Sequence, residues 1–136
     1  MKVMLDPGAY APKRAHKTDA GMDIMSRETM MVPAHCSATF STGVHIELPK
    51  GTAGVLKSKS GLHILNDITS DGLIDEGYSG EIKVKLTNHG DRDYWVMSGD
   101  KISQLLVVPV LYEPIEVVKD IAAGERGEAG FGSTGR

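Results

Sequence analysis

Cysteine is almost absent from this chain of 136 residues, in which Cys36 is the only one. A single cysteine can form no disulfide within the chain and cannot build a cysteine-rich zinc cluster. The composition is therefore typical of a protein of the reducing cytoplasm. We expect Cys36 itself to be a small residue of the core, because free cysteine is among the most buried residue types.

The chain also lacks an excess of charge of one sign and long apolar runs. The chain has 15 Lys and Arg against 18 Asp and Glu, a formal net charge of −3. This balance argues against non-specific electrostatic binding to nucleic acid or to an anionic membrane. A phosphate ligand would therefore have to be bound by a few local groups. Residues 1–6 contain no long apolar stretch, and neither a signal peptide nor a membrane span is expected. The 5 histidines share no ligand spacing, which argues against a zinc site.

Alternation of apolar and polar residues is the strongest periodic signal that the chain does contain. Residues 44–48 and 82–87 alternate, and each run ends in a turn with glycine, which predicts half-buried strands. Residues 102–108 form a short run of branched side chains, typical of a strand that is buried on both faces. The best helical candidate, 117–123, is brief. The pattern predicts one all-β domain, a sandwich or a barrel.

The C-terminal tail, residues 126–136, combines glycines, hydroxyls and guanidinium groups with one aromatic ring, Phe131. Glycine lets backbone N–H groups turn toward an anion, and arginine matches phosphate oxygens with a rigid fork. Phe131 offers a flat face for a base. The tail therefore suits a phosphorylated ring compound. The alternative is a frayed terminus, because glycine-rich composition also makes flexible linkers.

Two other segments carry groups that suit nucleotide chemistry. Segment 72–81 places Asp75 where a strand enters a tight turn, and a strand end can hold a carboxylate rigidly and aim it at a water. Asp and Gly in a hairpin also simply make the turn, so this segment alone leaves both interpretations open. Segment 57–61 is rich in lysine and serine and is compatible with phosphate. It lacks the glycine spacing of a P-loop, and its alternative is an exposed basic loop.

Five segments, in order and spread over nearly the whole chain, closely resemble the five motifs of the trimeric dUTP pyrophosphatases (dUTPases), in their bacterial and prophage versions. They are residues 12–24, 54–62, 72–81, 99–105 and 126–135. The resemblance implies a jelly-roll-like all-β fold and a nucleotide hydrolase.

By this resemblance, Asp75 would position and deprotonate a water for attack on the α-phosphorus of dUTP, which releases dUMP and pyrophosphate. The same hairpin would read uracil through its main chain around Leu73, Ile74 and Lys83, with no room for the methyl group of thymine. Tyr78 would lie beneath the deoxyribose and exclude a 2′-hydroxyl. Such an activity limits uracil in DNA and supplies dUMP for thymidylate synthesis.

The resemblance also implies contacts to the phosphates. Asp23 would hold waters of a Mg²⁺ ion that the triphosphate chelates. Ser60 and Gly61 would face the oxygen that bridges the α and β phosphorus atoms, and Gln104 would bind a phosphate oxygen. Lys59 stands where the family usually has Arg, so a point charge replaces a bidentate planar fork.

The fifth motif implies a closing arm. Arg126, Ser133 and Thr134 would clamp the γ-phosphate, and Phe131 would stack over uracil as the arm expels water. Gly132 belongs to the same nucleotide-binding segment.

Three positions leave a choice or depart from the pattern. Ala129 stands where the family usually has Gly, which matters for any positive φ at that position. The polar residue that precedes the catalytic hairpin and touches the nucleotide would be Thr69 or Ser70. Tyr94 and Trp95 could contact a partner subunit, but we interpret the pair as core.

The family is homotrimeric, with active sites that collect motifs from different subunits, and this chain is expected to assemble in the same way. We expect an all-β domain over residues 1–123 and a flexible arm over residues 124–136. Two alternatives stay open: a dCTP deaminase, alone or joined to diphosphatase activity, and a phage regulatory protein that binds a repressor. The segment between Leu86 and Gly99 is short, which speaks against the second.

Overall fold

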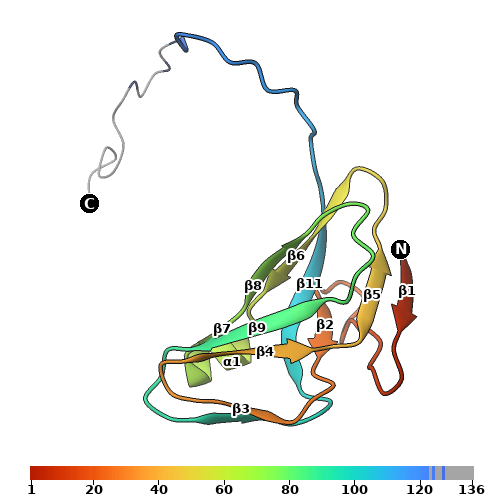
Figure 1. The fold of residues 1–136 in the computed structure, drawn as a ribbon, viewed down its shortest axis with the longest axis vertical. Helices are drawn as coiled ribbons and strands as arrows, with labels where there is room; N and C mark the ends of the chain where they lie inside the picture. Colours follow the sequence, from red (N-terminus) through yellow and green to blue (C-terminus); the bar gives the residue numbers. More distant parts are fainter. Residues whose placement is uncertain (123, 125–126, 128–136) are drawn as a thin grey trace.

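The computed structural model describes residues 1–122, 124 and 127, and it is built almost entirely of antiparallel strands (Figure 1). The strands are β1 (Lys2–Leu5), β2 (Met22–Met25), β3 (Met30–Val32), β4 (Ser37–Ser41), β5 (Val44–Glu47), β6 (Thr52–Lys57), β7 (Ile68–Thr69), β8 (Asp71–Ile74), β9 (Lys83–Asn88), β10 (Tyr94–Val96) and β11 (Lys101–Pro109). The helix found among the described residues is α1 (Ser60–Asn66). The predicted all-β, jelly-roll-like class is confirmed.

Two sheets and two ribbons enclose the core. One sheet has the order β2-β11-β6-β8 and the other the order β4-β9-β7, while β1 pairs with β5 and β10 with β3. Phe40, Ile24 and Leu105 lie between them without solvent exposure. Because each strand alternates its side chains between the two faces, one face of each sheet supplies the core.

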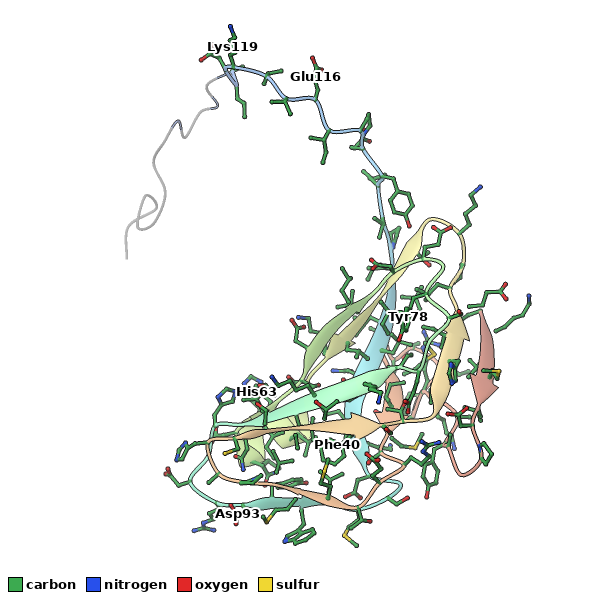
Figure 2. The ribbon with its side chains drawn as sticks, viewed as in Figure 1. Phe40, His63, Tyr78, Asp93, Glu116 and Lys119 are labelled. Carbon is green, nitrogen blue, oxygen red and sulfur yellow. The ribbon has the colours of Figure 1, made fainter. Side chains whose placement is uncertain are left out.

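Three predicted strands are found as β5, β9 and β11. The helical candidate at 117–123 forms no helix over its described residues 117–122, because residues 110–122 form no helix or strand after β11 ends. Figures 1 and 2 show this segment leaving the body as an extended chain, with Glu116 and Lys119 on its far part. Ile115 and Val117 are each 94% exposed. A brief apolar run without a surface to pack on has too little to hold a helix together.

Within the part of the chain that the structure describes, no helix is long and apolar enough to span a membrane.

Candidate active site

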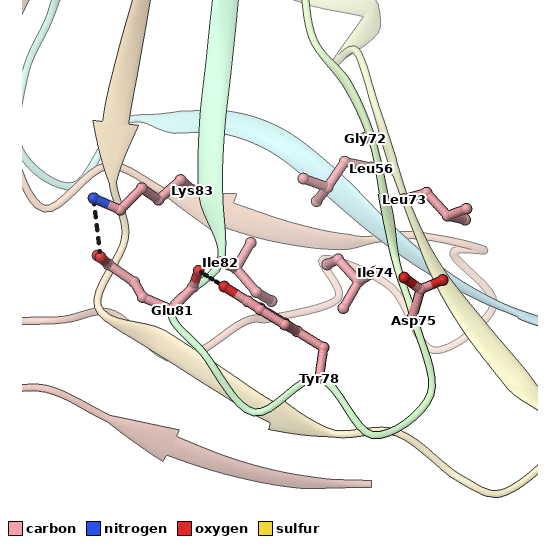
Figure 3. Close-up of a pocket in the computed structure, with 9 residues that line it drawn as sticks. All are labelled: Leu56, Gly72, Leu73, Ile74, Asp75, Tyr78, Glu81, Ile82 and Lys83. Atoms are coloured by element: carbon pink, nitrogen blue, oxygen red, sulfur yellow. Dashed lines mark hydrogen bonds and ion pairs between the residues drawn. The ribbon is translucent and has the colours of Figure 1, made fainter.

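A hollow of about 520 Å³ opens where β8 turns toward β9. We call residues 75–82, which join the two strands, the hairpin turn. The hairpin residues that the resemblance assigned to the uracil, the deoxyribose and the attacking water all line this hollow. The full lining is Leu56, Gly72, Leu73, Ile74, Asp75, Tyr78, Glu81, Ile82 and Lys83 (Figure 3).

The strands on the two sides of the hollow belong to different sheets. β8 is the last strand of its sheet and pairs with β6, and β9 pairs with β7 only at Thr87 and Asn88. The β8 edge and the Lys83 end of β9 therefore face the hollow without a neighbouring strand. Backbone N–H and C=O groups at such edges can pair with a ligand as they would with another strand. Leu73 and Tyr78 are 68% and 49% exposed, so apolar surface is accessible there as well.

The local sequence makes the hairpin turn. Gly77 has φ +85°, a left-handed conformation that favours glycine, and the Tyr78 N–H donates to the Asp75 carbonyl at 3.1 Å. The Tyr78 hydroxyl donates to the Glu81 carbonyl at 3.1 Å, so that the ring reaches across the turn (Figure 3). A Cβ on Gly80 would lie 2.4 Å from that hydroxyl oxygen. Glycine at position 80 thus permits the close approach of the ring.

Glu81 anchors the far end of the turn, a role that the sequence reasoning missed. Its carboxylate accepts a hydrogen bond from the Gly43 N–H at 2.9 Å and lies 3.6 Å from the Lys83 ammonium group. Burial raises the pKa of Glu81, but the Gly43 hydrogen bond and the charges of Lys83 and Arg27 outweigh it and lower the pKa below its usual value. The signal was present in the sequence, since Glu81 closes the third motif.

A second group of predicted residues gathers around Asp23 on β2. The Asp23 carboxylate pairs with the Lys101 ammonium group at 2.7 Å and with that of Lys59. Burial raises the pKa of Asp23, but the hydrogen bonds and charges of Lys101 and Lys59 hold it below its usual value. The site thus presents an ionised carboxylate beside two ammonium groups that can meet phosphate oxygens. Sequence reasoning did not select Lys101, although it lies within the fourth motif.

Strand pairing brings Gln104 to the same place. Gln104 lies opposite Asp23 on β2 and opposite Lys57 on β6, and its side-chain amide donates to the Ser58 carbonyl at 2.9 Å. Ser60 and Gly61 open α1 immediately after Lys59, and Gly61 faces open space. We call Asp23, Lys59, Ser60, Gly61 and Gln104 the phosphate cluster.

Asp23 is the one carboxylate of this cluster that the waters of a Mg²⁺ ion could meet, and Lys59 and Lys101 hold its two oxygens. Mg²⁺ usually keeps several waters and binds one or two carboxylates together with substrate phosphates. Asp23 supplies one ionised carboxylate. Across residues 1–122, 124 and 127, no group of three or more His, Cys, Asp or Glu side chains gathers that could hold a metal ion.

Thr69 and Ser70 lie outside the hollow of the hairpin turn. The Ser70 hydroxyl is buried and hydrogen-bonded to that of Ser103 at 2.9 Å, whereas the Thr69 hydroxyl meets the His89 ring at 2.9 Å. Both residues line a separate hollow of about 210 Å³ with Asp71. Which of the two contacts the nucleotide stays a prediction.

Within one protomer Asp75 and Lys59 lie near opposite ends of β6, although Leu56 of β6 also lines the hollow. β6 runs between them, with Gly54 opposite Ile74 and Lys57 opposite Asp71. Continuing this register places Asp75 beside Ala53, six residues before Lys59, which corresponds to roughly 20 Å of extended chain. Asp75 and the start of α1 therefore lie at opposite ends of β6 within one protomer.

The predicted arm residues Arg126, Phe131, Gly132, Ser133 and Thr134 lie outside the described residues.

The chain matches the family model "dUTPase" over residues 8–135. It is 43% identical over 134 residues to the deoxyuridine 5′-triphosphate nucleotidohydrolase of Clostridium acetobutylicum, covering 96% of this chain and 92% of that protein. The enzyme of the same name from Clostridioides difficile is also 43% identical, over 96% of this chain and 94% of its own length.

Solved structures give the same result. The dUTPase of Staphylococcus bacteriophage 80alpha with dUPNHPP superposes with a TM-score of 0.92 at 31% identity, covering 99% of this chain and 98% of that one. A mutant dUTPase from phage phi11 of S. aureus, described as showing the coordination of a structural Mg(II) ion, has a TM-score of 0.82 at 29% identity. That match covers 90% of this chain and 98% of the phage protein.

Proposed function

Because this chain belongs to the dUTPase family, whose model spans residues 8–135, we propose that it hydrolyses dUTP to dUMP and pyrophosphate. The observation that carries the proposal is the hollow of the hairpin turn, which unites Asp75, Tyr78 and two open strand edges. The activity would keep uracil out of DNA and supply dUMP for thymidylate synthesis. The enzyme would act in the cytoplasm. If a phage carries the gene, this would be the cytoplasm of the host.

Asp75 is the general base of this reaction. It takes a proton from a water whose oxygen attacks the α-phosphorus, the bond from that phosphorus to the bridging oxygen breaks, and pyrophosphate leaves with the electron pair. The strand edges at Leu73, Ile74 and Lys83 hydrogen-bond uracil, and the main chain of this turn leaves no room for a 5-methyl group. The Tyr78 ring supports the deoxyribose and excludes a 2′-hydroxyl.

The phosphate cluster holds the triphosphate. Lys59, Gln104 and the start of α1 at Ser60 and Gly61 meet phosphate oxygens, where charge develops as pyrophosphate leaves. A bound Mg²⁺ would neutralise phosphate charge, and Asp23 would orient its waters. Lys101, paired with Asp23 at 2.7 Å, adds a cation to this group. Arg126, Phe131, Gly132, Ser133 and Thr134 would close over the bound nucleotide.

We propose a homotrimer with shared sites, as the family resemblance implies, and the separation of Asp75 from Lys59 along β6 supports it. Because Asp75 and Lys59 lie apart within one protomer, we propose that a complete site combines the hollow of one subunit with the phosphate cluster of another. A closed ring of identical subunits provides this arrangement at every site. The proposed domain of residues 1–123 would include the extended segment 110–122, and residues 124–136 would form the arm.

One assay tests the proposal and separates its alternatives. The protein is incubated with dUTP or dCTP and Mg²⁺, and the products are identified. Pyrophosphate and dUMP from dUTP are the expected result. Ammonia from dCTP would indicate a deaminase, and no turnover of either nucleotide would leave a regulatory role such as repressor binding.

A further inference from the structure

Glu76 is a residue of the hairpin turn to which the proposed reaction gives no task. It follows Asp75 directly but does not line the hollow that holds Tyr78. It lines a second hollow of about 650 Å³, which shares Leu73 and Asp75 with the first. Because Glu76 follows Asp75 directly, a contact that holds Glu76 also constrains the backbone of Asp75.

Two hydrogen bonds end on one carboxylate oxygen of Glu76. Its Oε2 accepts from the Gly51 N–H at 2.7 Å and from the Tyr112 hydroxyl at 2.8 Å. The Tyr112 and Gly51 hydrogen bonds hold the pKa of Glu76 below its usual value. Both bonds are therefore made to a charged acceptor and are stronger than bonds between neutral groups.

Gly51 connects the same point to the end of β11. It has φ +74°, and its carbonyl accepts from the Val110 N–H at 2.9 Å. Three segments meet here: the turn between β5 and β6, the hairpin turn, and the chain that follows Pro109. Tyr112 is the third residue of that last segment, which continues toward residues 126–136.

We infer that Glu76 is a positioning residue: together with Gly51 and Tyr112, it fixes the Asp75 turn relative to the root of the C-terminal segment. The inference rests on the proposed function for its effect on rate. Glu76 touches no reacting atom, and it acts through the placement of Asp75 and through the direction in which the segment leaves the body.

Substitutions at the two side chains test this role. Glu76→Ala should lower kcat for dUTP roughly tenfold, the effect of losing hydrogen bonds to a charged group. Tyr112→Phe, which removes one hydroxyl, should cause a smaller loss, and Glu76→Gln, which keeps an acceptor oxygen, should restore most of the rate. Combining Glu76→Ala with Tyr112→Phe should add nothing to Glu76→Ala alone, because Glu76→Ala already removes the hydrogen bond that Tyr112→Phe removes.

The Kd for dUMP and a matched tyrosine serve as controls. The residues of the first hollow are unchanged, so dUMP should bind all these variants as it binds the wild type. Tyr10 also has a hydrogen-bonded hydroxyl, 3.2 Å from Ser98 Oγ, and Tyr10→Phe should leave kcat unchanged. A weakened dUMP Kd with unchanged kcat, or an equal loss in Tyr10→Phe, would overturn the inference.

Amide hydrogen exchange without nucleotide separates this inference from the proposed function. In Tyr112→Phe, exchange should become faster both in residues 75–82 and in residues 110–112. If both segments respond but the wild type does not hydrolyse dUTP, the proposed function fails and the link between the segments stands. Unchanged exchange in the hairpin turn overturns the link whatever the activity.

Discussion

Asp75 and Asp23 are both carboxylates, but their surroundings give them different chemistry. Asp23 is 7% exposed and held by two lysines, so its charge is already matched. Asp75 borders two hollows and belongs to none of the ion pairs found among the described residues. A proton acceptor must reach its water, and Asp75 has that access.

We therefore expect Asp75→Asn to keep binding a non-hydrolysable dUTP analogue while kcat falls by ~10²–10⁴-fold, the usual contribution of a general base. Asp91, whose carboxylate is 95% exposed beside His35, provides the control. Asp91→Asn should turn over dUTP at the wild-type rate. A wild-type rate in Asp75→Asn would remove Asp75 from the mechanism.

The lowered pKa of Asp23 predicts a dependence of stability on pH. A carboxyl group whose pKa is lower in the folded protein stabilises the fold above its unfolded value, and this contribution is lost as pH falls through the folded value. For Asp23 that window lies below the ordinary value of 3.8. Asp23→Asn should cost about 1–3 kcal/mol at pH 7, as expected for hydrogen bonds to a charged group. Denaturant unfolding should show the deficit shrinking at acid pH. A deficit that stays constant with pH would contradict this account.

Two single residues show where sequence reasoning fails. Cys36, expected in the core, is exposed, because it lies in the turn between β3 and β4. Trp95, also interpreted as core, is 60% exposed, because the alternation of β10 buries Val96 and turns Trp95 outward. Residue type sets a preference for burial, but the phase of the strand decides the face.

At the scale of elements, alternation predicted β5 and β9 and gave no sign of α1. The strands β5 and β9 carry their pattern in adjacent residues, so a short window reveals them. α1 is seven residues long and contains no buried residue, and Ile64 and Leu65 are 73% and 79% exposed. Without a buried face it has no apolar stripe to detect.

The hairpin turn predicts nucleotide selectivity. The protein should prefer dUTP strongly over UTP, because in the proposed site the Tyr78 ring fills the space of a 2′-hydroxyl, and over dTTP, because the main chain of the turn is proposed to exclude a 5-methyl group. Gly80→Ala should weaken the discrimination against UTP, since its Cβ would displace the tyrosine hydroxyl 2.4 Å away. Tyr78→Phe keeps the ring and should keep the preference. The measurement is kcat/KM for dUTP compared with kcat/KM for UTP and for dTTP. Equal values for UTP and dUTP in the wild type would refute the role of Tyr78.

At the scale of the whole molecule, the motifs could be recognised from sequence, but their separation within one protomer could not. That separation depends on β6, near whose two ends Asp75 and Lys59 lie. Local patterns contain no information about such a distance, because it is set by strand pairing between segments remote in sequence.

Shared sites predict that two inactive variants rescue each other. Asp75→Asn lacks the base but keeps its phosphate cluster, whereas a variant with both Lys59→Ala and Ser60→Ala keeps its hollow. After mixing at equal amounts and re-assembly, about a quarter of the sites should combine an intact hollow with an intact cluster from another subunit. Activity should return to about that fraction of wild type. Mixtures that remain inactive after demonstrated subunit exchange would mean that each site belongs to one chain.

The proposed C-terminal arm should be needed for turnover but not for assembly. Deleting residues 126–136 should leave the body and the trimer intact, because a glycine-rich terminus adds little to a core, yet kcat should fall steeply with the loss of the γ-phosphate clamp. Phe131→Ala should lose part of that effect, since stacking on a base is worth roughly 1–3 kcal/mol. Arg126→Ala should weaken binding of a triphosphate analogue more than binding of dUMP, because dUMP lacks a γ-phosphate. Sedimentation and steady-state kinetics on the same preparations separate the outcomes. Normal turnover by the truncated protein would exclude a lid, and dissociation into monomers would assign residues 126–136 to assembly instead.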